Sequence, residues 1–388
     1  MLQLFERGRQ IQFKMKSFAN KKINRNKDMK IGINSRLLQE GKGGIPLYIK
    51  NLYTELLRID KKNNYIFFQT GENTKIGSTK ILKTIKGTVG AFLFDNFLVN
   101  NLIKKEKVNV FHGPSCVLPL LRLKDVKYIV TVHDLAFLKT PQIYGLLYKT
   151  YYSLALKLSL KNADIVITDS KSAKNDIIEF FKIQESKIKV IHLGVDNAFW
   201  DADHKERIIK EKYFFSLTTH PKRKNIVSVL EVMSKHKEFK KYKYVIAGLI
   251  GDDQLTELRS LIKNLGLIDN VVLWGYVSKD QLINFYQNAE FFIFPSFYEG
   301  FGFPVLEAMA CKCPVVTSNN SSLTEITPNK DWLVDPCNLK DIYNKMSKMI
   351  KLKKEDRDEL INSNYKFSKQ FSWSKTAEEY IKLFEYLK

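Results

Sequence analysis

The sequence predicts an α/β protein made of two doubly wound parallel-sheet domains. The chain has 388 residues, a length that suits two or three domains. Its hydrophobic fraction of 44% supplies enough apolar material for packed cores, so a wholly disordered chain is excluded. From residue 30 onward, short and nearly continuous apolar runs alternate with amphipathic segments of helix length. This alternation is typical of parallel strands joined by helical crossovers.

The predicted strands are short and rich in β-branched and aromatic residues, as strands buried on both faces are. They span residues 30–34, 108–111, 128–132, 164–169 and 189–192 in the first half, and 214–217, 244–247, 271–274, 291–294 and 314–317 in the second. The charged segment 201–212 shows no strand pattern, and we place the domain linker there. The domains 29–200 and 213–372 are then each suited to one Rossmann-like unit.

The two ends of the chain lie outside these domains. Residues 1–28 are basic and lack periodicity, and we interpret them as a mobile tail. They lack the apolar core of a signal peptide, and no run of about 18 uncharged apolar residues occurs in the chain, so export and membrane insertion are disfavoured. In the last segment, 373–388, apolar residues recur with helical spacing from Ala377 to Leu387. They predict an amphipathic helix whose start packs on the second domain.

The charge is unevenly distributed. The formal net charge is +22, of which +18 lies before residue 201 and +4 after it. Such a surplus favours a polyanionic partner or an anionic membrane surface. A nucleic-acid-binding protein is the competing class, but the sequence contains no recognisable nucleic-acid motif and its basic residues are spread out. Four cysteines are too few for a disulfide framework, which fits a reducing compartment.

The most specific motif is the string PSFYEGFGFPVLEAMA at residues 295–310. The predicted strand 291–294 runs into a glycine-containing loop, and Pro304 stands near the first turn of the next helix. Gly300 and Gly302 let the backbone come close to a ligand. The free N–H groups of the loop and of the helix start favour an anion such as a diphosphate.

Two carboxylates flank this loop with seven residues between them. Glu299 stands before the helix, and Glu307 stands about one turn inside it. Because a carboxylate accepts hydrogen bonds from vicinal hydroxyls, one glutamate is suited to hold a ribose and the other a sugar. Either glutamate alone also fits an ordinary surface position near a strand-to-helix turn, so the whole string carries the prediction.

With this string, the sequence resembles the retaining GT-B glycosyltransferases, specifically glycosyltransferase family 4 (glycosyl transferases group 1), and it looks mannosyltransferase-like. Glu299 and Glu307 match the family's Glu-x7-Glu signature, and the adjoining run AMACKCPVV at 308–316 also matches the family pattern. Further family landmarks occur in order: Gly43-Gly44-Ile45, His133-Asp134-Leu135, Ala163-Asp164 through Ser170, Gly194-Val195-Asp196, Lys222-Arg223-Lys224-Asn225 and Gly275-Tyr276-Val277. The resemblance covers residues 29–388.

The resemblance implies the GT-B architecture, in which two Rossmann-like domains face each other across a cleft. It implies that residues 29–200 bind the acceptor and that residues 213–372 bind a nucleotide-sugar donor. The implied catalytic residues are His133 and Glu299. The implied donor-binding residues are Gly43, Gly44, Arg223, Lys224, Glu299, Gly300, Phe301, Gly302 and Glu307.

The resemblance also implies a role for each of these residues. Glu307 holds the ribose, Glu299 and His133 hold the sugar, and the glycine-rich loop lies near the donor phosphates and the acceptor. Arg223 and Lys224 neutralise the diphosphate leaving group, the main electrostatic task of glycosyl transfer.

The chain departs from the family pattern at one point. The family often places a Gly-Arg pair shortly before the lysine, where this chain has Thr218-Thr219. Arg223 is the natural substitute for that arginine.

The implied reaction is the transfer of a hexose, with retention of configuration, from a nucleotide-diphospho sugar to a growing saccharide. We favour GDP-mannose, because the Phe-Gly-Phe-Pro and His-Asp-Leu strings resemble mannosyltransferases of surface-polysaccharide assembly; a UDP- or dTDP-sugar stays open. The favoured acceptor is lipid-linked, in cell-surface polysaccharide or lipopolysaccharide biosynthesis, and the alternative is a soluble sugar or sugar phosphate. The family needs no metal, so we expect no metal or other cofactor.

A basic and aromatic segment bears on the location. Residues 144–161 mix leucines and tyrosines with lysines over a helix length, and residues 92–99 are a second candidate of this kind. Such a helix is suited to an anionic bilayer surface, and the favoured alternative is a helix in the core of the first domain. We expect a cytoplasmic protein held peripherally at the inner face of the cytoplasmic membrane.

Overall fold

The computed structural model describes residues 28–40, 43–71, 76–82, 87–140, 143–203, 206–248 and 251–388. The predicted tail, 1–28, lies outside these residues except for its last position. None of the helices in the described ranges is long and apolar enough to cross a membrane.

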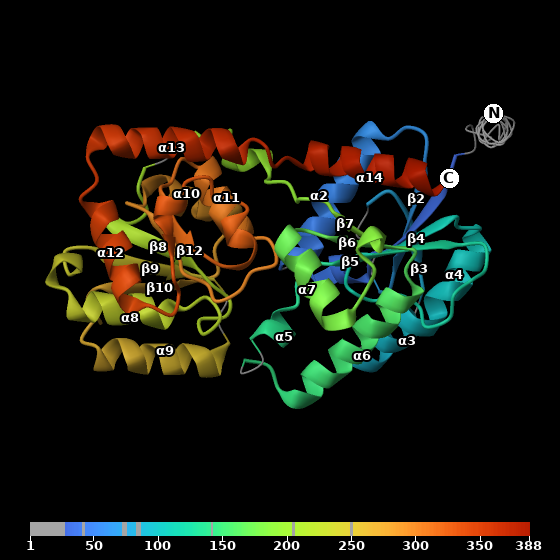
Figure 1. Cartoon of the computed structure of the whole chain (residues 1–388), viewed down its shortest axis with the longest axis horizontal. Helices are drawn as coiled ribbons and strands as arrows, with labels where there is room; N and C mark the ends of the chain where they lie inside the picture. Colours follow the sequence, from blue (N-terminus) through green and yellow to red (C-terminus); the bar gives the residue numbers. More distant parts are fainter. Residues whose placement is uncertain are drawn as a thin grey trace, which may run out of the picture.

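Two parallel sheets form the two halves of the molecule (Figure 1). Within the described residues, the first sheet has seven strands in the order β3-β2-β1-β4-β5-β6-β7, and the second has six in the order β10-β9-β8-β11-β12-β13. The first comprises β1 Lys30–Asn34, β2 Asn64–Gln69, β3 Ser78–Ile81, β4 Val110–Gly113, β5 Lys127–Val132, β6 Ile165–Thr168 and β7 Ile188–Val190. The second comprises β8 Tyr213–Leu217, β9 Lys243–Ala247, β10 Val271–Gly275, β11 Phe292–Phe294, β12 Val315–Ser318 and β13 Leu333–Val334.

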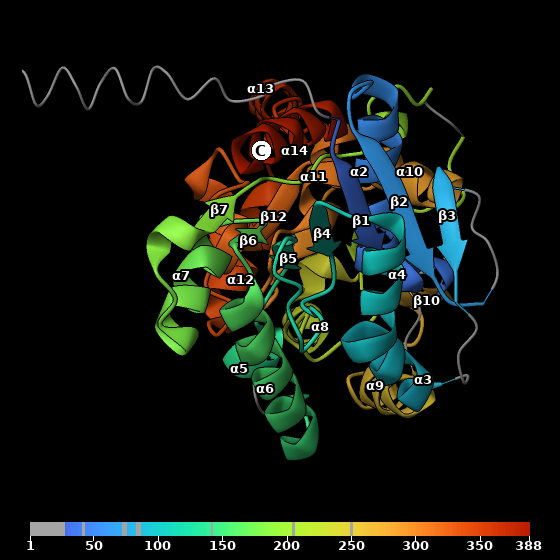
Figure 2. The same ribbon diagram turned by 90° about the vertical axis from the view of Figure 1, so that its right-hand side faces the viewer.

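Helices cover both faces of each sheet (Figures 1 and 2). In the first half they are α2 Gly44–Ile59, α3 Thr88–Leu93, α4 Val99–Glu106, α5 Ala136–Lys139, α6 Leu146–Asn162 and α7 Lys171–Phe181, with a π-helical turn, Phe94–Leu98, between α3 and α4. The others are α8 Ile226–Lys235, α9 Asp252–Asn264, α10 Lys279–Asn288, α11 Phe303–Ala310, α12 Leu339–Ile350, α13 Lys354–Ser368 and α14 Trp373–Leu387. The prediction of two α/β units is thus confirmed.

The strand order explains where a site should form. It reverses between β1 and β4 in the first sheet and between β8 and β11 in the second, so both sheets are doubly wound. In such sheets, ligands bind outside the carboxyl ends of the strands at the reversal. The chain leaves β1 toward Gly43, β8 toward Arg223 and Lys224, and β11 toward Glu299.

The last helix joins the two halves. Its bounds agree with the predicted helix, and Trp373 at its start contacts Phe303 of the second half, with ring centroids 6.1 Å apart. The rest of α14 packs on α2 of the first half: the Tyr380 and Tyr48 hydroxyls form a hydrogen bond. The start of the helix packs on the second half, as predicted, and the rest of its apolar face completes the core of the first half.

Candidate active site

A cleft of about 1070 Å³ opens between the two halves, at the carboxyl ends of their strands. All ten sequence-predicted residues line it: Gly43, Gly44, His133, Arg223, Lys224, Glu299, Gly300, Phe301, Gly302 and Glu307. The structure thus brings together residues from both halves of the chain, on opposite walls of one cleft.

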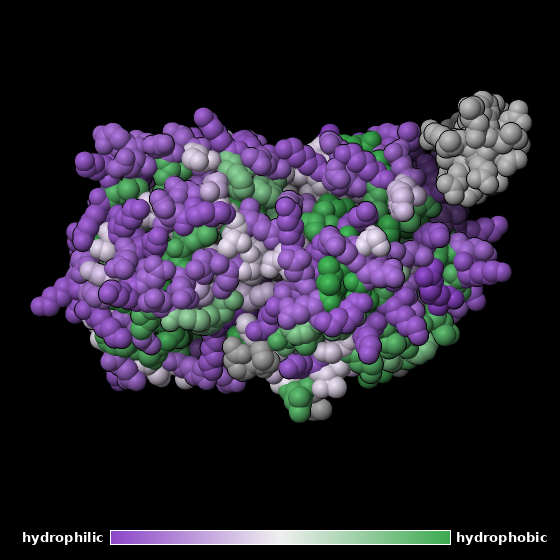
Figure 3. Space-filling view, viewed as in Figure 1, coloured by the Kyte–Doolittle hydropathy of each residue, from purple (hydrophilic) through white to green (hydrophobic). Residues whose placement is uncertain are grey.

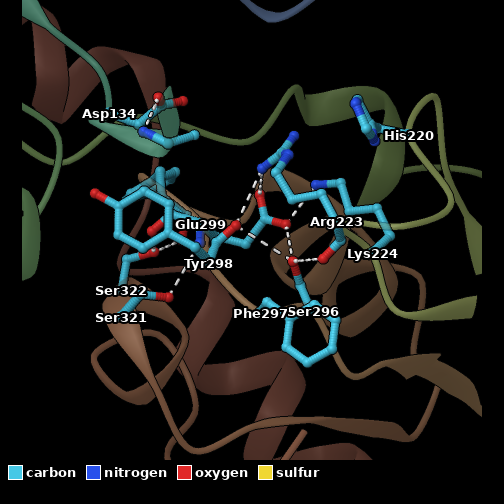
Figure 4. Close-up of polar contacts among 12 residues, drawn as sticks. Asp134, His220, Arg223, Lys224, Ser296, Phe297, Tyr298, Glu299, Ser321 and Ser322 are labelled. Atoms are coloured by element: carbon cyan, nitrogen blue, oxygen red, sulfur yellow. Dashed lines mark hydrogen bonds and ion pairs between the residues drawn. The ribbon is translucent and has the colours of Figure 1, made fainter. Parts of the chain in front are cut away.

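Glu299 lies at the centre of a charge cluster (Figure 4). Its buried carboxylate forms an ion pair with the Lys224 ammonium, accepts a 2.6 Å hydrogen bond from Ser296 Oγ, and lies 3.4 Å from a guanidinium nitrogen of Arg223. The same guanidinium nitrogen donates to the Tyr298 carbonyl at 3.0 Å. Because Arg223 and Lys224 precede α8 and Glu299 follows β11, the cluster ties the two central loops of the second sheet together.

The cluster carries a net positive charge. Burial lowers the pKa of Lys224 to about 8, although the Glu299 carboxylate works in the opposite direction. Burial pushes the pKa of Glu299 upward, but Lys224 and Arg223 outweigh it and hold that pKa below its usual value. Two cations and one carboxylate in a buried setting leave one positive charge in excess, which a diphosphate would neutralise.

Glu307 has the opposite environment. It lies in α11, which begins after Gly302 at a φ of +105° without a side-chain cap. Among the described residues, its buried carboxylate accepts a single long hydrogen bond, 3.4 Å from the Tyr286 hydroxyl. Burial, reinforced by Asp196 and partly opposed by Lys279, raises its pKa to about 7. Glu307 is thus a buried acceptor with almost no donors of its own, as a site for ligand hydroxyls requires.

A second helix start faces the same cleft. Gly43 precedes α2 and also provides no side-chain cap. The N–H groups of the first turn of a helix are unsatisfied donors with a partial positive charge. Pro46 and Pro304 lack an N–H, and the Val305 N–H donates to the Gly302 carbonyl at 3.1 Å. The uncapped starts of α2 and α11 therefore present donors from both walls of the cleft at Gly44, Ile45 and Phe303, an arrangement suited to an anion.

The two glycines of the motif line the cleft and also lie close to other parts of the protein. A Cβ on Gly300 would lie 2.2 Å from the His133 carbonyl oxygen and 2.6 Å from the Asp134 Cβ atom. A Cβ on Gly302 would lie 2.7 Å from Ile326 and 2.9 Å from Leu323. Each glycine thus allows another part of the protein to pack closely against it, and the approach of a ligand to the same backbone stays a prediction.

His133 follows β5, and both of its ring nitrogens are engaged. Nδ1 lies 2.7 Å from an Asp169 carboxylate oxygen, and Nε2 lies 3.0 Å from the Pro114 carbonyl oxygen. The Tyr48 ring packs against the imidazole edge to face, with centroids 4.6 Å apart. The ring lines the cleft, but a hydrogen bond from it to a sugar hydroxyl would require one of these two bonds to be exchanged.

Two hydrogen bonds hold the motif loop against α7 and its N-cap in the first half, and Glu325 adds two more from outside the loop. The Tyr298 hydroxyl donates to Asp176 at 2.8 Å, and Ser170 Oγ donates to the Gly300 carbonyl, also at 2.8 Å. Glu325 of the second half accepts the first two N–H groups of α7, at 2.9 and 2.7 Å. The negative carboxylate at the positive end of this helix locks the two halves in the observed arrangement.

The sequence-based prediction missed several residues that line the cleft: Tyr48, Asp169, Thr219, Gly248 and Tyr276. A signal existed for Asp169, because it directly follows β6 at the sheet edge where His133 follows β5. Thr219 lines the cleft at the departure from the family pattern, while Arg223 reaches Glu299. Among the described residues, no group of three or more His, Cys, Asp or Glu side chains is arranged to hold a metal ion.

Comparisons with known proteins agree with this architecture. The family model described as "Glycosyltransferase Family 4" matches residues 69–199, and "Glycosyl transferases group 1" matches residues 199–367. The chain is 27% identical to the O-antigen chain mannosyltransferase B of Escherichia coli over 299 residues, covering 74% of this chain and 76% of that protein. It is 30% identical over 220 residues to the O-antigen chain mannosyltransferase RfbU of Salmonella typhimurium, covering 56% and 58%. A 31% identical match to the serotype-specific mannosyltransferase WbdA of Escherichia coli spans 56% of this chain but 28% of WbdA.

Solved structures share the fold at low identity. Sucrose-phosphate synthase from Thermosynechococcus elongatus superposes with a TM-score of 0.76 at 17% identity, covering 92% of this chain and 99% of that one. WaaG, a glycosyltransferase involved in lipopolysaccharide biosynthesis, gives a TM-score of 0.70 at 11% identity, covering 90% and 98%. The two adjoining family models, the paired doubly wound sheets and these neighbours show that the chain is a GT-B glycosyltransferase of family 4, glycosyl transferases group 1.

Proposed function

We propose that this chain is a retaining hexosyltransferase that extends a saccharide during cell-surface polysaccharide or lipopolysaccharide biosynthesis. The donor is a nucleotide-diphospho sugar, with GDP-mannose favoured because three relatives of the chain are mannosyltransferases. The favoured acceptor is lipid-linked. Product analysis with lipid-linked and soluble acceptors separates this proposal from the alternative of a soluble sugar or sugar phosphate.

The cleft supports a mechanism in which the leaving group helps the acceptor. The acceptor hydroxyl attacks the anomeric carbon from the face that the diphosphate leaves, the bond to the phosphate oxygen breaks, and a phosphate oxygen takes the hydroxyl proton. Arg223, Lys224 and the start of α11 stabilise the charge that develops on the diphosphate. Since these groups supply the positive charge, the proposal assigns no role to a metal ion or other cofactor.

One observation carries the proposal, namely the buried and nearly unpartnered carboxylate of Glu307. We expect Glu307→Gln to raise the donor KM by about 10- to 100-fold, because a hydrogen bond to a charged acceptor contributes about 1.5–3 kcal/mol. Steady-state kinetics over a panel of nucleotide sugars, with the acceptor saturating, measures this effect. An unchanged donor KM would contradict the assignment of the donor site.

The same substitution weakens donor binding but is expected to stabilise the fold at alkaline pH. Burial raises the pKa of Glu307 from 4.5 to about 7, so the folded chain holds this proton more tightly than the unfolded chain. Stability is therefore lost as the pH rises from about 4.5 to 7. Glu307→Gln removes this loss, so its Tm exceeds that of the wild type at pH 8 and equals it near pH 4.5. Glu359→Gln, at an exposed position beyond the first turn of α13, is the control that changes neither KM nor Tm.

The exposed surface of the first half supports a peripheral membrane location. The inner face of α6 buries Leu156 and Leu160, as a core helix does, while Tyr151, Leu154 and Leu158 form an exposed stripe on its outer face. Figure 3 shows hydrophobic residues along the lower edge of this half, where α6 and α3 lie in Figure 1. Exposed lysines at 157 and 161 flank the stripe. An apolar stripe with lysines beside it is suited to the interface of an anionic bilayer.

Vesicle binding tests this location. We expect the protein to sediment with phosphatidylglycerol vesicles, less so with rising salt, and not with phosphatidylcholine vesicles. Leu154→Glu with Leu158→Glu abolishes binding, while Ile268→Glu, at a residue 62% exposed on the second half, leaves it unchanged. Absent or salt-independent binding by the wild type counts against a membrane surface as partner.

A further inference from the structure

We propose that Asp169 is a positioning residue that keeps His133 doubly protonated, so that His133 contributes a fixed positive charge to the cleft and does not act as a base. The inference rests on the proposed function for its catalytic consequence. Its structural part concerns only the protonation of one imidazole ring, which is measured without substrate.

The sheet places the two side chains together. Val132 at the end of β5 is the register partner of Thr168 at the end of β6, so His133 and Asp169 leave the sheet side by side. The carboxylate of Asp169 is 2% exposed and the imidazole of His133 is 15% exposed. The Asp169 carboxylate lies on the buried side of the imidazole ring, inside the first half. The ring itself lines the cleft.

The two partners of the ring set its protonation. The Pro114 oxygen is a carbonyl, which only accepts, so Nε2 must carry a hydrogen. Nδ1 faces a carboxylate oxygen at 2.7 Å, a distance that requires a proton between the two atoms. A neutral imidazole has one N–H and cannot donate to both acceptors, so the alternative is a protonated Asp169 that donates to Nδ1. Burial raises the pKa of Asp169, but the charge and the hydrogen bond of His133 oppose that rise, and a carboxyl ordinarily loses its proton at a lower pH than an imidazole does.

The electrostatic balance agrees with this count. Burial works against the charged ring, but Asp169, through its charge and its hydrogen bond, outweighs burial and raises the pKa of His133 above its usual value. The other titratable side chains that face the pair come from α2, β4, the loops after β4, β5 and β7, and α14: Tyr48, His112, Cys116, Asp134, His192 and Tyr380. Burial, followed by the charge on His133, lowers the pKa of His112 to about 3, so the ring of His112 is neutral beside that of His133. Burial and the Asp134 carboxylate raise the pKa of the Cys116 thiol to about 12.

The consequence concerns the distribution of charge around the donor. Arg223 and Lys224 bring a net positive charge from the second half, and a protonated His133, paired with the Asp169 carboxylate behind it, turns the positive end of an ion pair to the cleft from the first. A diphosphate that departs between the two walls is then stabilised from both sides. Asp169 does not touch the ligand in this proposal and acts only through His133.

The test replaces Asp169 with asparagine, which keeps the size of the side chain and removes its charge. In the wild type we expect the imidazole nitrogen resonances of His133 to show two N–H groups from pH 6 to 8. In Asp169→Asn they titrate at a pH lower by about one unit or more, because a neighbouring carboxylate changes a pKa by about 1–3 units. The loss of kcat/KM at alkaline pH moves down by the same amount, so the rate at pH 8 falls and recovers toward pH 6.

Control variants separate this role from a structural one. Asp169→Glu keeps the charge and restores most of the alkaline activity. Asp60→Asn removes a buried carboxylate of the first half that is bonded to Tyr65 and lies outside the cleft, and it leaves the pH profile unchanged. Because Lys224 also loses its charge on the alkaline side, the resonances of His133 itself are the deciding readout.

Three results would overturn the inference. The first is a neutral His133 ring in the wild type at pH 7, which is decisive even where Asp169→Asn fails to fold. The second is an unchanged pH profile in a folded Asp169→Asn variant. The third is a gain of activity at acid pH in that variant, which would make His133 a base. A wild type that transfers no sugar contradicts the proposed function and leaves the resonance test intact.

Discussion

Replacing Lys224 with alanine is expected to reduce kcat for sugar transfer by about 10²- to 10³-fold, the usual effect of removing one group that stabilises charge in a transition state. The ammonium of Lys224 is buried, paired with Glu299 and placed over the Phe294 ring at 4.6 Å, so water cannot replace it. Within the described part of the chain, its removal also leaves Glu299 with Arg223 as its one remaining ion-pair partner.

The neighbouring lysine provides the control for this experiment. Lys222 belongs to the same run of basic residues, but its side chain is 60% exposed and pairs with Glu257 at 2.8 Å, away from the cluster. Lys222→Ala is expected to retain the wild-type rate. Both variants are measured in the presence of EDTA, with circular dichroism to verify folding. Equal rates for Lys224→Ala and the wild type would contradict the assignment of the diphosphate site to this cluster.

Replacing Gly300 with alanine is expected to reduce the transfer rate by about 10²-fold, the effect of displacing reacting groups by about 1 Å. The new Cβ would lie 2.2 Å from the His133 carbonyl oxygen, and neither backbone can yield without moving one half of the molecule against the other. The variant should fold, because the sheet of each half stays intact. Small-angle scattering should then show a more open molecule.

Gly251→Ala is the matched control in the same half of the protein. Gly251 has ordinary extended backbone angles, and a Cβ there meets nothing within 4 Å. We expect this variant to have the wild-type rate and the wild-type scattering curve. A Gly300→Ala variant with full activity would show that the observed contact between the halves does not belong to the catalytic state.

The buried strands were predictable because their residues are apolar without interruption. All ten predicted strands overlap observed ones, whereas β2, β3 and β13 were missed. The edge strand β3 reads Ser-Thr-Lys-Ile and has no fully buried side chain, so it lacks the pattern of an internal strand. Strand β13 has two residues, too few for any pattern. The run Ile66-Phe67-Phe68 in β2 does carry the pattern, and the prediction omitted it.

The candidate site was predictable where one short string contained its residues. The string around Glu299 and Glu307 specified both glutamates and their loop. The roles of other residues depend on partners far away in the sequence. Nothing local to Gly300 indicates that it faces the His133 carbonyl, and nothing local to His133 indicates that Asp169 occupies its Nδ1. The helical spacing of apolar residues in α14 likewise predicted that one side of the helix is buried. It did not predict that this side packs on α2 of the first half.

The packing of α14 has a consequence for the order in which the protein is made. Ribosomes synthesise the first sheet and α2 long before residues 373–387, yet Tyr48 and Tyr65 of the first half lie against Tyr380 and Phe384 of α14. Until that helix emerges, the face of α2 that it covers stays open to water. The first half therefore cannot complete its core until the end of the chain has been synthesised. A nascent chain halted near residue 200 would expose the apolar face of α2, which chaperones would have to cover.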